Sequence, residues 1–290
     1  GVYKDAHGNT PIMRSIKKAE SHLWKTESTK TYTSMTGDSG FHNAMADLVL
    51  ADSVDRDRLS FCATPGGTGA IHHVLELVKL TESNPKIWFS DPTWGNHLTI
   101  AKHLKMAVGK YSYFNNETRA VDFEAMVSDL SKISNGDIVV LHGCCHNPTG
   151  ANLNNEQWNI IADLLLEKDA IPFIDIAYQG FGEGIEEDAF GTRLLASKFP
   201  EMFIAASCSK NFGIYRERCG IVITVSKNPD ISSITQGNLS YVNRQNFSFP
   251  PDHGARLVTM VLTDPDLRAD WVSELEQVRV GMLDARTHLA

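Results

Sequence analysis

The sequence has little cysteine, and its cysteines lack the spacing that is typical of a disulfide framework or a structural zinc site. Cys62, Cys144, Cys145, Cys208 and Cys219 are an odd number in 290 residues, and no two of them have C-x-x-C spacing. This usage is typical of proteins in a reducing compartment. We therefore expect a cytoplasmic protein without structural disulfides.

The sequence also lacks long apolar runs and an excess of basic residues. Its 27 Lys and Arg against 35 Asp and Glu give a net charge of −8. That balance disfavours nucleic acid and anionic membranes as the main partners. No apolar run approaches the ~20 residues of a membrane span, and no signal peptide or lipidation motif is found. The 42% hydrophobic content is that of an ordinary globular protein.

Neither end of the sequence has the features of a natural terminus. The chain opens GVYKDAHGNTP without a Met. In its last segment Val272, Leu275, Val278 and Met282 recur at helical spacing, and no Gly or Pro follows to end the helix. We expect a piece of a longer protein, cut at both ends.

Short apolar runs alternate with helical patterns along the chain. This alternation predicts an α/β fold with a mainly parallel central sheet and helices on both of its faces. Helices are expected over 69–80 and over 155–170, the second with Asn154 or Asn155 as its N-cap. The strands are expected at 86–90, 137–143, 171–177, 202–208 and 219–225.

Polar or aromatic groups beside Gly or Pro follow four of these strands. In a sheet of this kind ligands bind beyond the carboxyl ends of the strands. One such strand end is explained by turn preferences alone, but four of them predict a binding site. The four segments are DPTWGNH (91–97), HGCCHNPTG (142–150), DIAYQGFG (175–182) and CSKNFG (208–213).

Lys210 ends an apolar strand, directly after the hydroxyls of Ser207 and Ser209. It is either a solvated surface lysine or an amine that forms a Schiff base. The second interpretation calls for pyridoxal phosphate, whose pyridine nitrogen needs a carboxylate to stay protonated. Asp175, at the end of another strand, is the best candidate for that partner.

Other residues could hold the rest of such a cofactor. Tyr178 and Asn147 can donate to its phenolic oxygen, and Trp94 can stack on its ring. The segment PGGTGA (65–70) leads into a helix and offers backbone N–H groups to the phosphate, with Arg218 as the cation.

Each of these residues also has a simpler interpretation. Asp175 alone could be a helix cap or half of an ion pair, and Trp94 alone could be a core residue. The GGTGA segment matches neither dinucleotide-binding nor P-loop spacing. His142 and His146 could suggest a metal, but no carboxylate or cysteine arrangement in the sequence completes a zinc site. No metal is expected.

Three long motifs resemble one family. HGCCHNPTGANLNNEQW, IDIAYQGFGEGIEED and SCSKNFGIYRERCG are similar to the aspartate and aromatic amino-acid aminotransferases, and in particular to the aromatic type of alphaproteobacteria. The resemblance covers essentially the whole chain. It implies the fold-type I pyridoxal-phosphate fold, with a large domain over 12–268. Residues 1–11 would belong to the small domain or N-terminal segment, and 269–290 would begin a long helix leading to the small domain.

The resemblance implies a role for each matching residue. Lys210 would form the Schiff base with pyridoxal phosphate and carry the proton, and Asp175 would pair with the pyridine nitrogen. The remaining cofactor contacts would be Tyr178 and Asn147 at the phenolic oxygen, Trp94 on the ring, His97 and His142 behind the aspartate, and Gly67, Thr68, Ser207 and Arg218 at the phosphate. Tyr32 would reach the phosphate from a partner subunit.

The same resemblance implies the substrates and the assembly. Arg244 would cross from the partner subunit to a substrate's distal carboxylate, and Gly1 would lie near the substrate carboxylate. The protein would be a homodimer with shared active sites. It would exchange amino groups between tyrosine, phenylalanine or aspartate and 2-oxoglutarate. Phe249 differs from the Asn that many aspartate-specific members carry, and Gly95 differs from the family's usual Pro after the tryptophan, so the substrate preference stays open.

Three functions are alternatives to an aromatic and aspartate aminotransferase. They are an aspartate-specific aminotransferase, another pyridoxal-phosphate reaction such as β-elimination or decarboxylation, and the ligand-binding domain of a transcription regulator. Arg244 favours dicarboxylic partner substrates, and GVYKDAHGNTPIMRSIKKAE shows little sign of a winged helix. The family's arginine for the α-carboxylate, its N-terminal arm and most of its small domain have no counterpart in the sequence. The chain alone is therefore expected to be inactive, and the intact protein active.

Overall fold

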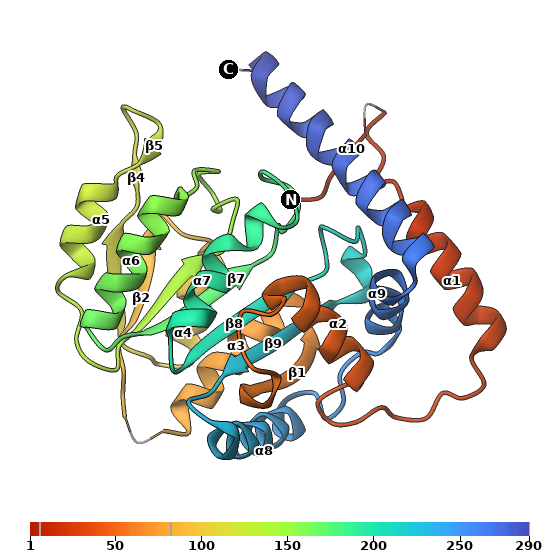
Figure 1. Cartoon of the computed structure of the whole chain (residues 1–290), viewed down its shortest axis with the longest axis horizontal. Coiled ribbons are helices and arrows are strands. Elements are labelled where there is room, and N and C mark those ends of the chain that lie inside the picture. Colours follow the sequence, from red (N-terminus) through yellow and green to blue (C-terminus); the bar gives the residue numbers. More distant parts are fainter. Residues whose placement is uncertain (6, 82, 290) are drawn as a thin grey trace.

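The computed structural model describes residues 1–5, 7–81 and 83–289. Within this part of the chain, seven strands form one sheet in the order β1-β9-β8-β7-β6-β2-β3, and β4 pairs with β5 separately (Figure 1). The strands are β1 Leu59–Pro65, β2 Ile87–Asp91, β3 Val108–Ser112, β4 Phe114–Asn115, β5 Ala120–Val121, β6 Ile138–His142, β7 Ile171–Ile176, β8 Met202–Ser207 and β9 Cys219–Val225.

The expectation of a mainly parallel α/β sheet is confirmed. Strands β3, β2, β6, β7 and β8 pair in parallel, whereas β9 runs antiparallel to both β8 and β1. All five predicted strands are present, each within one residue of its predicted ends. The carboxyl ends of β6, β7 and β8 therefore lie side by side at one edge of the sheet.

Helices cover both faces of the sheet (Figure 1). The helices are α1 Arg14–Thr26, α2 Ser39–Leu50, α3 Gly66–Lys79, α4 Gly95–His103, α5 Phe123–Leu130, α6 Asn155–Glu167, α7 Phe190–Lys198, α8 Pro229–Asn246, α9 His253–Thr263 and α10 Pro265–Leu289, with short turns η1 Arg56–Arg58, η2 Glu187–Ala189 and η3 Tyr215–Glu217.

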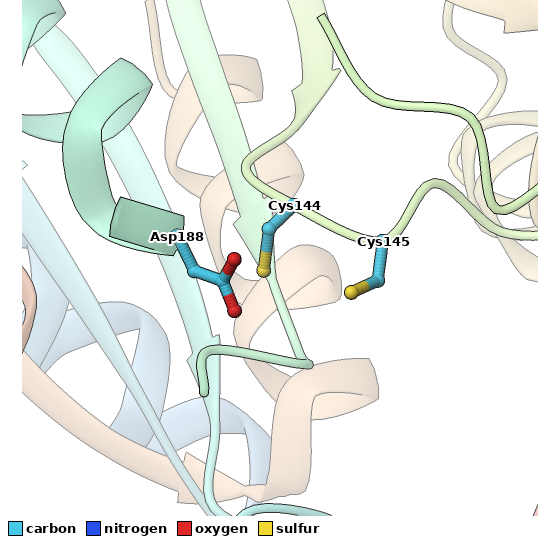
Figure 2. A group of neighbouring side chains, drawn as sticks. All are labelled: Cys144, Cys145 and Asp188. Atoms are coloured by element: carbon cyan, nitrogen blue, oxygen red, sulfur yellow. The ribbon is translucent and has the colours of Figure 1, made fainter. Parts of the chain in front are cut away.

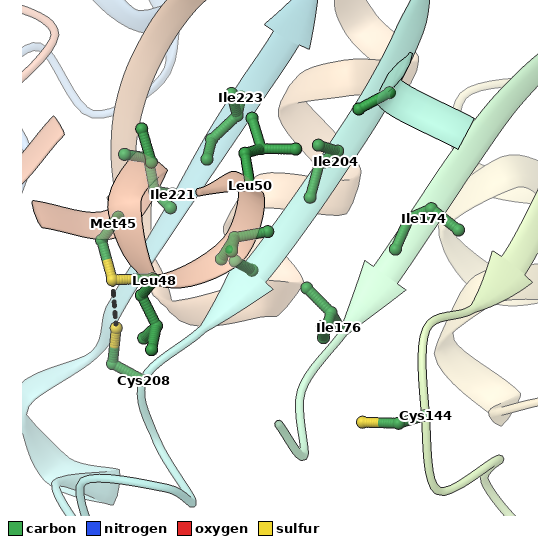
Figure 3. Close-up of a cluster of buried hydrophobic side chains, with 14 of the residues drawn as sticks. Met45, Leu48, Leu50, Cys144, Ile174, Ile176, Ile204, Cys208, Ile221 and Ile223 are labelled. Carbon is green, nitrogen blue, oxygen red and sulfur yellow. Dashed lines mark hydrogen bonds between the residues drawn. The ribbon is translucent and has the colours of Figure 1, made fainter. Parts of the chain in front are cut away.

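Buried residues alternate between two apolar clusters along the central strands. In β7, Phe173 belongs to the cluster under α3, α4 and α8, and its neighbour Ile174 belongs to the cluster under α2, α7 and α9. Figure 3 shows the second cluster, where isoleucines of β7, β8 and β9 face Met45 and Leu48 of α2. Burial on both faces explains why these strands read as uninterrupted apolar runs.

The two predicted helices differ from the structure at one end each. The first begins at Gly66 rather than at 69, so its glycines form the first turn of α3. The second begins as predicted, with Asn154 as N-cap in a capping box with Gln157, but it ends at Glu167 rather than at 170. Asp169 has φ of +52°, a left-handed conformation that an α-helix cannot continue through.

The long helix α10 begins at Pro265, four residues before its predicted start at 269. Its first half is anchored, because Trp271 stacks on Phe212 at 4.7 Å and Leu275 is buried. It lies along α1 (Figure 1), and Lys18 of α1 forms an ion pair with Asp270 of α10. The predicted domain boundaries stay predictions. Among the described residues, no helix combines the length and apolar character that a membrane span requires.

Candidate active site

A cavity of about 210 Å³ opens at the carboxyl ends of β6, β7 and β8. It lies where the sequence predicts a site, since ligands of parallel sheets bind beyond these strand ends. Most of the predicted site residues line it: Gly1, Gly67, Thr68, Trp94, His142, Asn147, Asp175, Tyr178, Ser207, Lys210 and Arg218.

Asp175 is the next-to-last residue of β7, beside the cavity, and is 8% exposed. Its Oδ2 accepts a hydrogen bond of 2.9 Å from His97 Nε2. Burial alone would raise the pKa of Asp175, but the hydrogen bond from His97 and the positive charge of Lys210 lower it below its ordinary value. The carboxylate is therefore held in its ionised form, as a partner for a cation must be.

A chain of hydrogen bonds behind Asp175 fixes the tautomers of the two predicted histidines. The Asn147 backbone N–H donates to His142 Nδ1 at 3.4 Å, so His142 Nε2 carries the proton and faces Thr93 Oγ1 at 3.3 Å. Thr93 Oγ1 lies 2.8 Å from His97 Nδ1, which leaves the His97 Nε2–H for Asp175. Burial lowers the pKa of His142 to about 4, so it stays neutral in this chain.

Lys210 follows the end of β8 and is half-buried, with its Nζ 4.8 Å from the centre of the Tyr178 ring. Burial lowers the pKa of the amine, the charge of Arg218 adds to this, and Asp175 opposes it. A lysine with a lowered pKa is deprotonated more readily and is a better nucleophile at neutral pH. This excludes a freely solvated surface lysine.

Tyr178 and Asn147 face the cavity from the β7 and β6 loops. Burial raises the pKa of Tyr178, as do the charges of Asp175, Cys145 and Tyr215, whereas a hydrogen bond with the Asn147 side chain lowers it. The net effect is to keep the phenol protonated. Both side chains can therefore donate a hydrogen bond to a ligand oxygen.

The start of α3 forms an anion cradle. Gly66 has φ of +73°, and a Cβ there would come within 2.5 Å of Arg218 Nη2. A Cβ on Gly67 would lie 3.0 Å from the Ser207 side chain. The missing side chains leave the first N–H groups of α3 accessible beside a guanidinium, Thr68 and a serine hydroxyl, which is the donor set of a phosphate site.

Trp94 completes the cavity with a flat surface. It is the N-cap of α4, and its ring stands edge-on to His97 at 5.4 Å. The cavity thus combines an ionised carboxylate, an aromatic face, a half-buried amine and a phosphate cradle. This donor set fits a phosphorylated pyridine aldehyde.

The comparisons with known proteins agree with this geometry. The family model of aminotransferase class I and II matches residues 1–290. The chain belongs to the class I and II aminotransferases. It is 52% identical over its whole length to an aromatic-amino-acid aminotransferase of Paracoccus denitrificans, covering 74% of that protein. It is 39% identical over 96% of its length to an aspartate aminotransferase of Haemophilus influenzae, covering 71% of it.

The fold of this chain is also similar to that of a solved aminotransferase structure. An aromatic-amino-acid aminotransferase of Burkholderia pseudomallei, solved covalently bound to pyridoxal phosphate, superposes with a TM-score of 0.96 at 35% identity. The match covers 99% of this chain and 73% of the Burkholderia chain. The predicted recognition and fold class are confirmed.

Three predicted site residues do not line the cavity: His97 lies behind Asp175, to which it is hydrogen bonded, and Tyr32 and Arg244 lie away from the cavity. Tyr32, 78% exposed, stacks on Phe249 at 4.5 Å, and the Arg244 guanidinium lies 5.7 Å from the same ring. Neither Tyr32 nor Arg244 lines the cavity of its own chain. They form instead one exposed cluster, here called the Tyr32–Arg244 cluster, with Phe249 between them.

The two histidines that raised the possibility of a metal are fully engaged. Both ring nitrogens of His146 are hydrogen bonded, to Ser90 Oγ at 2.9 Å and to Thr149 Oγ1 at 2.8 Å. Those of His142 are taken up by Thr93 and the Asn147 backbone. Neither histidine offers a free nitrogen for coordination.

Sequence analysis missed several residues of the cavity wall. Ser209 was noted only as a neighbour of Lys210, and Tyr215 was not considered. The Tyr215 hydroxyl accepts a hydrogen bond of 3.1 Å from the Tyr3 backbone, which ties the N-terminal segment to the cavity rim. Tyr215 lies five residues after Lys210 in one quoted motif, and that proximity was the available signal. Ile71, Cys144 and Ala177 complete the wall.

Proposed function

We propose that this aminotransferase uses pyridoxal phosphate to exchange amino groups between an aromatic or acidic amino acid and 2-oxoglutarate. The observation that carries the proposal is the half-buried amine of Lys210 in one cavity with the ionised carboxylate of Asp175. Its five cysteines are free, and this supports action in the cytoplasm.

The residues present fit the cofactor. Asp175 would hold the pyridine nitrogen, Trp94 the ring face, and Tyr178 with Asn147 the phenolic oxygen. The phosphate would bind the first turn of α3, with Gly67, Thr68, Ser207 and Arg218 as partners. Lys210 Nζ would bind the aldehyde carbon covalently. When bound, pyridoxal phosphate supplies an electron sink for the charge that develops at the substrate Cα.

The residues of the cavity would have different roles in the reaction. Asp175, which is ionised and accepts a hydrogen bond from His97, would keep a proton on the pyridine nitrogen. Lys210 would accept a proton from the substrate Cα, because its lowered pKa favours the neutral amine. Tyr178 and Asn147 orient the reacting groups.

We assign the Tyr32–Arg244 cluster to the active site of a second copy of the chain. Both side chains are exposed, lie next to each other and lie outside their own cavity. An exposed aromatic–arginine pair is the composition typical of an interface anchor. A two-fold dimer would bring each cluster to the other subunit's cavity.

The range of substrates follows from the same cluster. Arg244 can pair with a side-chain carboxylate, which suits aspartate, glutamate and 2-oxoglutarate. Phe249 beside it offers an apolar surface, which suits an aromatic ring. The relatives of this chain include aromatic-amino-acid, tyrosine and aspartate aminotransferases, which supports both aromatic and acidic substrates.

The test is a panel of amino donors with 2-oxoglutarate, assayed on the full-length protein loaded with pyridoxal phosphate. Tyrosine, phenylalanine and aspartate should all be transaminated, whereas lysine and alanine should react much more slowly. Activity with aspartate alone would leave the aspartate-specific alternative. Release of ammonia or carbon dioxide without a new amino acid would indicate elimination or decarboxylation instead.

A further inference from the structure

Two adjacent thiols lie beside the cavity and take no part in the proposed chemistry. Cys144 and Cys145 follow β6 on the loop that carries Asn147, and Asp188 approaches them from η2 (Figure 2). One ligand atom from each of the three, two Sγ and a carboxylate oxygen, lie within 4.8 Å of one another. Sequence analysis assigned no role to the cysteines, because Asp188 is brought to them only by the fold.

Asp188 is held in place before any ligand binds. Its Oδ2 accepts hydrogen bonds of 2.8 and 2.9 Å from the backbone of Gly180 and Gly182, and its Oδ1 accepts one of 2.9 Å from Glu183. A carboxylate oxygen has two lone pairs, so Oδ1 keeps one for a further partner. Such fixed outer contacts orient ligands in metal sites.

One of the two thiols borders a second cavity of about 400 Å³, which Cys144 and Asp188 line together. Glu156, Glu183 and Glu187 line the same cavity, and all three are exposed. Carboxylates around such an entrance raise the local concentration of cations. Cys144 lines this cavity and the active-site cavity as well, so it connects the two.

We propose that Cys144, Cys145 and Asp188 form a binding site for a soft divalent cation such as Zn²⁺ or Cd²⁺, and that the ion inhibits the enzyme. Two thiolates and one carboxylate suit thiophilic ions rather than Mg²⁺ or Ca²⁺. Binding forms two metal–sulfur bonds and releases two thiol protons to solvent, so no oxidant is involved.

The inhibition follows from the position of the loop. The two cysteines lie within three residues of Asn147, whose backbone N–H bonds His142. Drawing both sulfur atoms onto one ion constrains Cys145, which already has a left-handed φ of +48°. The ion would therefore displace Asn147 and His142 from the positions that the cavity needs.

The experiment uses full-length holoenzyme and Cd²⁺ as the probe. We expect one Cd²⁺ per subunit by equilibrium dialysis, with the ultraviolet charge-transfer absorption of cadmium thiolate. Cys145→Ser should weaken binding at least about tenfold, since even outer contacts of metal sites are worth ~10–100-fold. Cys145 does not line the active-site cavity, so this variant should keep its basal activity. Cys62→Ser, a buried thiol of β1 in the other apolar cluster, is the matched control.

The outcomes separate binding from inhibition. Absence of the thiolate absorption, or equal affinity in wild type and Cys145→Ser, would overturn the site. If the site is correct, Cd²⁺ should inhibit wild type and Cys62→Ser equally, and Cys145→Ser only at about tenfold higher concentration. Equal inhibition of all three proteins would overturn the inhibitory role. The dialysis measurement does not depend on which amino acids the enzyme accepts.

Discussion

His97 donates a hydrogen bond of 2.9 Å from Nε2 to Asp175 Oδ2, with both side chains buried at the carboxyl edge of the sheet. The pair joins α4 to β7, and it overcomes the effect of burial on the aspartate, whose pKa is lowered rather than raised. Asp175 can therefore act as a fixed negative charge in the wall of the cavity.

Replacing that charge at nearly constant volume tests its role. Asp175→Asn should reduce turnover about 10²–10³-fold, because removing one preorganised electrostatic partner of a developing charge costs about this much. Part of the cofactor should remain bound through the phosphate cradle. Turnover and cofactor absorbance measured on the full-length variant are the readouts, and near-normal turnover would place the nitrogen's partner elsewhere.

The covalent role of Lys210 can be tested directly. Borohydride reduction of the yellow holoenzyme should leave one pyridoxyl group per subunit on the peptide that contains Lys210. Lys210→Ala should lose both the label and the activity, because no other lysine is among the described residues that line the cavity. Peptide mapping by mass spectrometry makes the assignment, and a pyridoxyl group on any other lysine would contradict it.

A buried histidine outside the site predicts how stability depends on pH. Burial lowers the pKa of His73 to about 4, and its Nε2–H donates to the Leu239 carbonyl at 3.1 Å. The unfolded chain binds a proton at His73 below about pH 6.5, whereas the folded state does not until about pH 4. Stability from this residue is therefore lost as the pH falls from 6.5 towards 4, by about 2 kcal/mol at pH 5.

The variant His73→Gln separates this effect from those of other histidines. Glutamine keeps a donor for the Leu239 carbonyl but does not titrate. Urea denaturation at pH 7.5 and pH 5 should show the variant losing about 2 kcal/mol less than wild type between the two values. The same loss in both proteins would mean that His73 is protonated in the folded state.

The sequence alone singled out Asp175 and Lys210 at two strand ends, and the structure brings both to one cavity. Asp175 and Lys210 each end an apolar run that is buried on both faces of the sheet, so their polarity stood out. Strand β3 was missed because it lies at the sheet edge, where Val108 is 40% exposed and Lys110 points into solvent. Its residues carry no apolar run to detect.

Contacts between turns that lie far apart in the sequence could not be predicted from the sequence. The approach of Asp188 to Cys144 depends on three backbone N–H groups of the loop at 180–183, and no periodicity encodes such a contact. The positions of Tyr32 and Arg244 were assigned only through resemblance to a family. Their exposed cluster agrees with that assignment, but the role itself depends on a second chain.

The proposed sharing of active sites between two subunits predicts complementation between inactive variants. Lys210→Ala removes a residue of a chain's own cavity, whereas Arg244→Ala removes one that is proposed to serve the partner. A hybrid of the two variants should contain one complete site, and equal mixing makes half of the dimers hybrids. About a quarter of wild-type activity towards aspartate should return, because half of the dimers are hybrids and each hybrid has one complete site out of two.

The mixing experiment needs evidence that hybrids form. Differently tagged subunits, unfolded together, refolded and purified through both tags, supply it. Hybrids that contain both tags and stay inactive, while each parent dimerises, would show that Arg244 acts within its own subunit.

The choice between acidic and aromatic substrates should depend on Arg244. Its guanidinium donates to Ser248 Oγ at 2.7 Å and lies beside the Phe249 ring, so it has both a polar and an apolar neighbour. Arg244→Leu should cost aspartate about 2–5 kcal/mol of transition-state stabilisation, the scale for removing one partner of a buried charged pair. Phenylalanine has no side-chain charge to lose and should lose less than about 1 kcal/mol, near the low end for a small change in an apolar pocket. The values of kcat/KM for both donors, measured on one preparation, provide the comparison. If aspartate and phenylalanine lost equally, Arg244 would serve folding or cofactor binding, and the acceptance of both substrate classes would need another explanation.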